Sequence, residues 1–194
     1  MKRKIFFIVS LTFFTVIMNA QKTVKITKIP ASVEEFVEMR NQIATSPEGG
    51  AAMFLLALKM YIEQPDLAKQ CFVTIVDRNS LREGNVYKGY QLLNGDMDLI
   101  KRQMANNKLI PNSYIKGAKP ENNYSVKLPY IYEFTSNRYS GDKAAGQFKV
   151  FAACSGASSP RPMSLKRNNR GIWKLTNWSS VLVGIAKPPI DDDL

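Results

Sequence analysis

The sequence predicts an α+β domain, with N-terminal helices packed on one face of a C-terminal, mostly antiparallel curved sheet. Residues 31–106 are dominated by segments with helical spacing of apolar residues, whereas residues 128–185 contain short alternating runs separated by turn residues. Helices that come first and strands that come last are typical of α+β proteins, because the strands pair with one another and the helices cover them. The length of 194 residues suits a single domain with one core.

A first helix is predicted from Ser32 to about Thr45. Ser32 and Glu35 match the S-x-x-E capping box, in which two side chains satisfy free backbone amides at a helix start. The apolar residues that follow fall on one side of this helix, and Arg40 alone interrupts the stripe.

A second helix is predicted to begin at Thr45 or Ser46 and to end before Pro65. Pro47 would lie in its first turn, where the missing amide of proline costs nothing. Residues Ala51–Leu58 are apolar on every side of the helix, so we expect most of its faces to be buried.

The middle of the chain is predicted to mix short strands, one helix and loops. The run Cys71–Val76 is short, apolar and rich in β-branched residues, which favours a buried strand. Asn94 and Gly95 indicate a turn, after which Asp96 can cap a helix. The other predictions for this region are a polar loop at Asp77–Gly84, a strand at Val86–Leu93, a helix from Asp96 to about Asn106 and a loop-like segment at Leu109–Tyr124.

The last third of the chain is predicted to form strands. Alternation places Tyr130, Tyr132 and Phe134 on one strand face, where packing in the core is favoured over a row that stacks on sugars. The same reasoning assigns Trp173 to the core. The five predicted strands are Leu128–Phe134, Gln147–Cys154, Pro162–Arg167, Ile172–Thr176 and Ser180–Ile185.

Residues 1–20 have the layout of a secretory signal peptide. Three cations precede an apolar run that is short for a membrane span, and cleavage is expected after Ala20, with an uncleaved anchor helix as the alternative. We therefore expect export to the periplasm or the extracellular space, and no transmembrane segment in the mature chain. The predicted organisation is a signal peptide at 1–20, a linker or edge strand at 21–30, a single α+β domain at 31–187 and a flexible acidic tail at 188–194.

Charge is unevenly distributed along the sequence. Residues 31–98 contain ten acids and six cations, whereas residues 99–190 contain three acids and fifteen cations. Such asymmetry indicates either a basic face for an anionic partner or two halves that attract each other within the fold. Because export separates the protein from intracellular nucleic acid, an acidic glycan or an anionic membrane surface is the expected partner of a basic face.

The cations are densest around a predicted hairpin near the C-terminus, in the stretch "LKRNNRGIWKLTNW" at residues 165–178. A solvated hairpin tip and a site for an anionic partner both fit this composition. The candidate binding residues are Arg161, Lys166, Arg167, Arg170, Lys174 and Trp178.

The sequence contains two cysteines, Cys71 and Cys154. Export makes a disulfide between them chemically possible. Both lie in apolar surroundings, where free cysteines behave as small buried hydrophobic residues. The sequence is therefore compatible with two alternatives, a Cys71–Cys154 disulfide and a pair of buried free thiols.

Few catalytic groups are available. The sequence has no histidine, which removes the common catalytic triads and imidazole metal ligands, and it has no zinc, nucleotide-binding or serine-hydrolase motif. We therefore expect a non-enzymatic binding or structural module without cofactor or metal. The alternative is a glycan-cleaving hydrolase that uses two carboxylates. Its candidate acids are Glu48, Asp77, Asp96, Asp98, Glu121 and Glu133.

The sequence resembles an uncharacterised family of exported bacterial proteins, a domain of unknown function common in gut anaerobes. The stretches that carry the resemblance include "VEEFVEMRNQIATSPEGGAAMFLLALKMY", "YKGYQLLNGDMDLIKRQ", "LPYIYEFTSN" and "SGASSPRPMSLKRNNRGIWKLTNWSSVLVGI". The SPEGG helix start and the SPRP…KRNNRGIWK stretch are its most specific parts. The resemblance implies one exported α+β domain, and it implies no activity or ligand.

Overall fold

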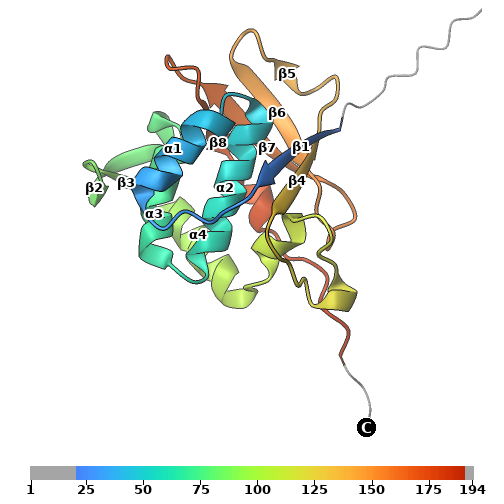
Figure 1. Cartoon of the computed structure of the whole chain (residues 1–194). Helices are drawn as coiled ribbons and strands as arrows, with labels where there is room; N and C mark the ends of the chain where they lie inside the picture. The colour runs from blue at the N-terminus through green and yellow to red at the C-terminus, as the bar shows by residue number, and fades with distance from the viewer. Residues whose placement is uncertain (1–20, 191–194) are drawn as a thin grey trace, which may run out of the picture.

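The structure, a computed structural model, describes residues 21–190. The predicted signal peptide and the last four residues of the acidic tail lie outside the described residues. Six strands form one antiparallel sheet, and helices cover one face of it (Figure 1), which confirms the α+β prediction. The sheet order is β1 (Lys22–Ile26), β4 (Tyr130–Thr135), β6 (Gln147–Ala152), β7 (Arg161–Arg167) and β8 (Trp173–Asn177), with β5 (Gly141–Asp142) paired to β6.

Three consecutive helices form the layer on the sheet. They are α1 (Val33–Ile43), α2 (Pro47–Tyr61) and α3 (Pro65–Ile75). Both predicted helix starts are confirmed, because the hydroxyls of Ser32 and Ser46 accept hydrogen bonds from amides in the first turns of α1 and α2. Residues Ala51–Leu58 of α2 are completely or almost completely buried, so α2 is the centre of the core as its composition predicts.

The strand predicted at Cys71–Val76 is wrong. Residues 71–75 form the last part of α3, and all of them are buried. A short apolar run has the same pattern in a buried strand and in a helix end buried on all sides, so the sequence pattern alone does not separate them. The chain becomes extended only at Val76, which forms a parallel bridge with Leu175 of β8.

The strand predicted at Ser180–Ile185 is also wrong. Residues Ser179–Leu182 form a 3-10 helix that follows β8. Its backbone carbonyl at Val181 accepts a hydrogen bond of 2.8 Å from the hydroxyl of Tyr114, and the Ser180 hydroxyl donates to the carbonyl of Pro162 at 2.6 Å. These long-range bonds fix a conformation that no local sequence signal indicates.

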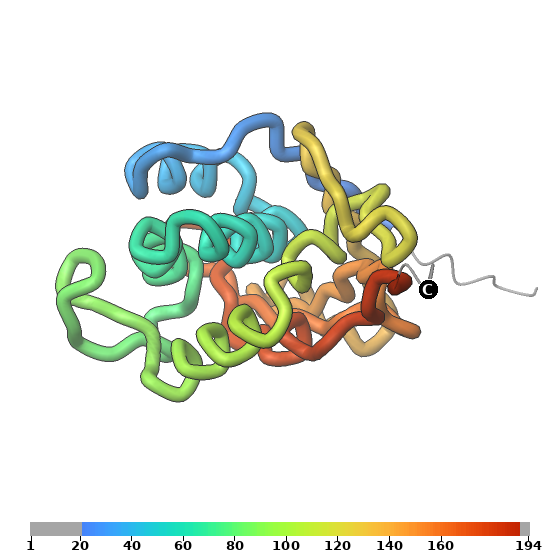
Figure 2. Tube along the Cα trace, turned by 90° about the horizontal axis from the view of Figure 1, so that it is seen from below, coloured from blue at the N-terminus to red at the C-terminus, as the bar shows by residue number. Residues whose placement is uncertain are grey.

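Residues 81–92 form a separate hairpin, which differs from the prediction for this region. Its strands are β2 (Leu81–Tyr87) and β3 (Tyr90–Leu92), where a loop and a single strand were expected. The two residues at its tip, Lys88 and Gly89, have φ angles of 48° and 82°, as hairpin turns of this length require. The hairpin, green in both views, projects from one side of the molecule (Figures 1 and 2).

The next helix, α4 (Asn94–Asn106), begins two residues earlier than predicted, so that Asp96 lies inside its first turn rather than capping it. The segment predicted as loop-like after α4 contains two short 3-10 helices, Ile110–Tyr114 and Pro120–Asn122. The predicted core assignment of aromatic residues in the sheet is confirmed: Tyr130, Tyr132, Phe134 and Trp173 are all buried.

The two cysteines are free and buried. Cys71 lies in α3, whereas Cys154 follows β6 and has its sulfur 3.3 Å from the hydroxyl oxygen of Ser113. The possible disulfide between them is therefore not formed. Burial raises the pKa of the Cys71 thiol to about 12, so this group is a protonated core residue at neutral pH.

Candidate anion-binding cleft

The six binding residues predicted from the sequence do not form one surface. Trp178 is 3% exposed, and its ring packs against Phe54 of α2 with a centroid distance of 5.2 Å. It is therefore a core residue, and its assignment to a binding surface is wrong. Arg161 lies at the far end of β7 from the hairpin turn, where it donates to the carbonyl of Gly184 at 3.4 Å.

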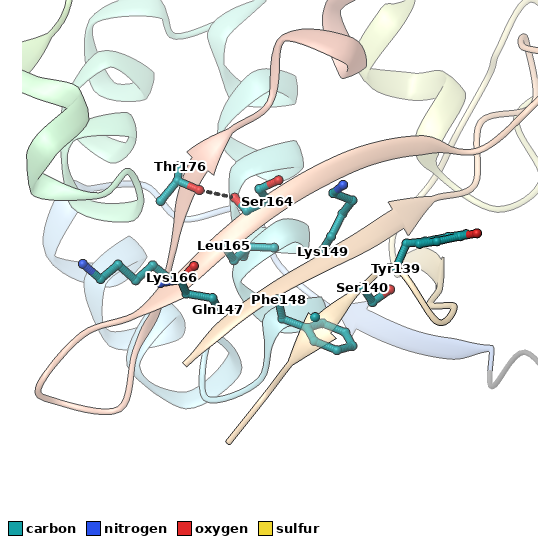
Figure 3. Close-up of a pocket in the computed structure, with 10 residues that line it drawn as sticks. Tyr139, Ser140, Gln147, Phe148, Lys149, Ser164, Leu165, Lys166 and Thr176 are labelled. Carbon is teal, nitrogen blue, oxygen red and sulfur yellow. Dashed lines mark hydrogen bonds between the residues drawn. The ribbon is translucent and has the colours of Figure 1, made fainter. Parts of the chain in front are cut away.

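Lys166 and Arg167 point to opposite faces of the sheet because they are neighbours in a strand. Arg167 lies over the ring of Trp173 and donates to the carbonyl of Ala144 at 3.1 Å. Lys166 lines an open groove of about 410 Å³ on the other face, together with Lys149 (Figure 3). Each of these two residues is exposed, but they serve different surfaces.

Arg170 and Lys174 do come together, in a cleft of about 730 Å³. The cleft lies between α1, the end of α3, the β2–β3 hairpin and the turn that joins β7 to β8. Its basic side chains are Arg40, Arg78, Lys88, Arg170 and Lys174. Asp77 is the one acidic residue among the side chains that line it, and Tyr87 and Tyr90 contribute aromatic rings.

Two of these cations converge on the end of α3. Arg40 Nη1 donates to the backbone carbonyl of Thr74 at 2.8 Å, and Lys174 Nζ donates to the same oxygen. Carbonyls in the last turn of a helix have no intrahelical partner and carry the negative end of the helix dipole, so they attract cations. This contact explains why Arg40 interrupts the apolar stripe of α1.

The hairpin holds two further cations against aromatic rings. The guanidinium carbon of Arg78 lies 3.8 Å from the centroid of the Tyr90 ring, and Lys88 Nζ lies 5.3 Å from that of Tyr87. Such cation–π contacts restrain long side chains without neutralising their charge. Arg78 and Lys88 are exposed, so their charge faces solvent at the wall of the cleft.

The positive charge of the cleft is not neutralised internally. Across residues 21–190, none of the five cations makes an ion pair with an acidic side chain. Burial and, to a smaller extent, the nearby Arg40 together lower the pKa of Lys174 to about 8, although Asp77 opposes the effect. Burial also lowers the pKa of Arg40; Tyr87 opposes this effect, and Arg170 adds a smaller contribution in the same direction as burial. These groups therefore lie close enough to repel one another, which an anion would relieve.

Residues 28–189 match the sequence profile of a protein family. The chain belongs to DUF6935, a domain of unknown function. This confirms the predicted membership of an uncharacterised domain family, and the cleft lies wholly within the matched residues. No curated protein and no solved structure matches the chain. In the part of this DUF6935 protein that the structure describes, no helix has the length and apolar character needed to cross a membrane.

The acids considered for a hydrolase are dispersed over this DUF6935 domain. Three of them are in ion pairs: Glu48 with Lys143, Asp98 with Lys101, and Glu133 with Lys116. Asp77 stands alone among the described residues that line the cleft, which therefore has no second carboxylate for a paired-acid mechanism. Asp96 and Glu121 lie in the first turns of α4 and of a 3-10 helix.

Five of the charged and aromatic residues that line the cleft are not among the site residues predicted from the sequence. Arg40 was recognisable in the sequence, because a single cation within the apolar stripe of a helix needs a hydrogen-bond acceptor or an acidic partner. Nothing in the sequence marked the others. They come from the hairpin and from the 3-10 helix Arg78–Ser80 before it, whose position against the turn between β7 and β8 is set by the packing of α3. The missed residues are Arg40, Arg78, Tyr87, Lys88 and Tyr90.

Replacing Lys174 with methionine is expected to change how stability depends on pH. The pKa of Lys174 is about 8 in the folded protein and about 10.4 in an unfolded chain. Between these values the unfolded state binds more protons, so this residue makes the free energy of unfolding rise with pH. Urea unfolding of both proteins between about pH 7 and pH 10 should show the wild type gaining stability relative to Lys174→Met. If the difference in free energy of unfolding between the two proteins stays constant across this pH range, the pKa of Lys174 is not lowered in the folded protein.

Proposed function

We propose that this DUF6935 domain is an exported, non-enzymatic binding module that holds an acidic glycan in its basic cleft. The observation that carries the proposal is the set of five cations without ion-pair partners among the described residues around a concave space of about 730 Å³. Ligand sites are typically concave, with a few polar groups that converge on the ligand. Export is part of the proposal and rests on the signal-like layout of residues 1–20.

The shape of the cleft favours a glycan over a membrane surface. A membrane presents a flat array of charge, which a convex or flat basic face meets better than a cleft. A glycan chain can enter the cleft, where its acidic groups meet the cations while its apolar sugar faces lie near Tyr87 and the partly buried Tyr90. The rival site for a membrane is the outer face of the sheet, which carries Lys25, Lys149 and Lys166.

Two of the five cations have a structural role as well. Arg40 and Lys174 satisfy the last turn of α3, so changing them would alter both binding and stability. Arg78, Lys88 and Arg170 are exposed and are therefore the right positions for a test. Surface substitutions of this kind usually change stability by less than about 0.5 kcal/mol.

The triple variant Arg78→Ser, Lys88→Ser, Arg170→Ser is expected to bind an oligogalacturonate at least about tenfold more weakly than the wild type, which corresponds to about 1.4 kcal/mol. The matched control is Lys22→Ser, Lys25→Ser, Lys149→Ser, which removes the same charge from β1 and β6, away from the cleft, and should retain wild-type affinity. Isothermal titration calorimetry measures both. Affinity of the wild type should fall steeply as salt is raised, because the contacts are electrostatic.

Further ligands distinguish binding through the charge of the glycan, binding in the cleft and binding to a membrane surface. A methyl-esterified oligogalacturonate has the same sugars without the charge, and it should bind far more weakly than the acid. Equal losses in the two triple variants would mean that binding follows net charge alone and would refute the cleft. Capture on anionic phospholipid vesicles that is abolished only in the control variant would replace the glycan with a membrane as the partner.

A further inference from the structure

Lys174 differs from the other cations of the cleft in its surroundings. It lies on β8 and is partly buried, and its amine reaches the carbonyl of Thr74 at the end of α3. The charged and titratable groups around it, from each packed element, are Arg40 on α1, Asp77 after α3, Arg78 and Tyr87 at the hairpin, Arg170 in the turn after β7, and Lys166 opposite it on β7. Four of these six neighbours are cations.

This environment favours the neutral amine. Burial and the nearby Arg40 lower the pKa of Lys174 to about 8, against an ordinary value of about 10.5. At pH 7.5 roughly a quarter of such amines are neutral, compared with roughly a thousandth of ordinary lysines. Desolvation next to another cation is a recognised way of making a lysine nucleophilic.

The hydrogen bond to Thr74 leaves the nucleophilic electron pair free. The carbonyl of Thr74 only accepts hydrogen bonds, so the amine of Lys174 must use an N–H to reach it. Arg40 donates to the same oxygen, so both lone pairs of the Thr74 carbonyl accept hydrogen bonds. The lone pair of the neutral amine is therefore not engaged in this contact, and Lys174 is one of the residues that line the open cleft.

We propose that Lys174 is a covalent capture residue, whose amine condenses with the carbonyl carbon of an anionic aldehyde or ketone held in the cleft. The proposal rests on the anion binding proposed above and names a chemical class for the ligand. The amine adds to the carbonyl carbon to give a carbinolamine. The carbonyl oxygen then leaves as water with the two protons of the amine, and a carbon–nitrogen double bond forms. The step needs neither an oxidant nor a reductant.

The surrounding cations determine which carbonyl compounds fit. Arg40 and Arg170 lie in the same cleft as Lys174 and can hold a carboxylate or phosphate group of the ligand. Binding of that group raises the local concentration of the carbonyl at the amine, and such proximity can accelerate a bimolecular reaction by a large factor. The open-chain end of an acidic sugar belongs to this class of ligand.

Pyridoxal 5′-phosphate is a suitable probe because it is a small anionic aldehyde. The full-length protein is incubated with it at pH 7.5, reduced with borohydride to trap the imine, digested and mapped by mass spectrometry. We expect Lys174 to be labelled at least tenfold faster than Lys88, an exposed lysine in the same cleft, and its labelling rate to rise with pH to a midpoint near 8. Pyridoxal, which lacks the phosphate, should label Lys174 more slowly, and Arg170→Ser should reduce the preference for the phosphorylated probe.

Two comparisons keep this test separate from that of anion binding. Pyridoxine 5′-phosphate has an alcohol in place of the aldehyde, so its binding reports only the anion site. If it binds in the cleft while Lys174 and Lys88 are labelled equally by the aldehyde, the capture proposal is wrong and anion binding stands. If it does not bind and labelling is spread over exposed lysines, the capture proposal is wrong as well, and the glycan titration decides the function on its own. Lys174→Arg should lose the fast labelling while Lys88→Arg keeps it.

Discussion

Replacing Gly49 with alanine is expected to destabilise the protein by about 3 kcal/mol or more. A Cβ atom at this position would lie 1.8 Å from the carbonyl oxygen of Ile43 and 2.7 Å from its carbonyl carbon. Both are backbone atoms at the end of α1, so no side-chain rotation can relieve the clash. The Gly49 amide is also fixed, because it donates to the hydroxyl of Ser46 at 3.1 Å.

The neighbouring glycine has a related constraint. A Cβ atom on Gly50 would lie 2.5 Å from the carbonyl oxygen of Trp173, at the start of β8. The junction between α1 and α2 is fastened to the same strand by a hydrogen bond of 2.8 Å from the Trp173 amide to the carbonyl of Ala44. The SPEGG stretch is therefore a close-packing motif, which lets two helices and a strand meet at backbone distance.

Gly95→Ala is the matched control for Gly49→Ala. Gly95 lies in the first turn of α4, and a Cβ atom there would meet nothing within 4 Å. The change should be neutral or slightly stabilising, since it reduces the freedom of the unfolded chain. Urea unfolding followed by circular dichroism gives both free energies. Similar values for the two variants would mean that the approach of α1 to α2 is less close than the structure has it.

The second large effect is expected for Trp178→Ala, which should cost about 3–5 kcal/mol. Trp178 is buried at the start of the 3-10 helix after β8, and its ring is tilted by 46° against that of Phe54. Removing the indole leaves a large cavity beside α2, which a rigid helix cannot close. This expectation follows from the core position that replaces its predicted role in binding.

A binding role for Trp178 would give a different result. Trp178→Phe keeps an aromatic ring in the core and should lose clearly less stability than the alanine variant. Its affinity for the oligogalacturonate should equal that of the wild type, because Trp178 does not line the cleft. If Trp178→Phe folds with nearly wild-type stability but loses affinity for the oligogalacturonate, Trp178 contributes to the binding site.

The helix starts and the faces of the sheet strands were predictable because their causes are local. Ser32 and Ser46 cap helices through amides only three residues away. The alternation of Tyr130, Tyr132 and Phe134 predicts their burial because successive side chains of any strand point to opposite faces. The end of α3 and the segment after β8 were predicted wrongly, since their conformations depend on contacts with residues far away in the sequence.

By itself, the sequence determined the α+β class, the cap residues and a C-terminal half in which cations far outnumber acids. The tertiary structure alone decided which cations share a site. Alternation along β7 separates Lys166 from Arg167, while the packing of α1 and β8 around the end of α3 brings Arg40 and Lys174 to the same carbonyl of Thr74. Charge density along a chain reports composition, but a binding site needs side chains that converge. Convergence depends on distances between elements, and those are set by the burial of the apolar core.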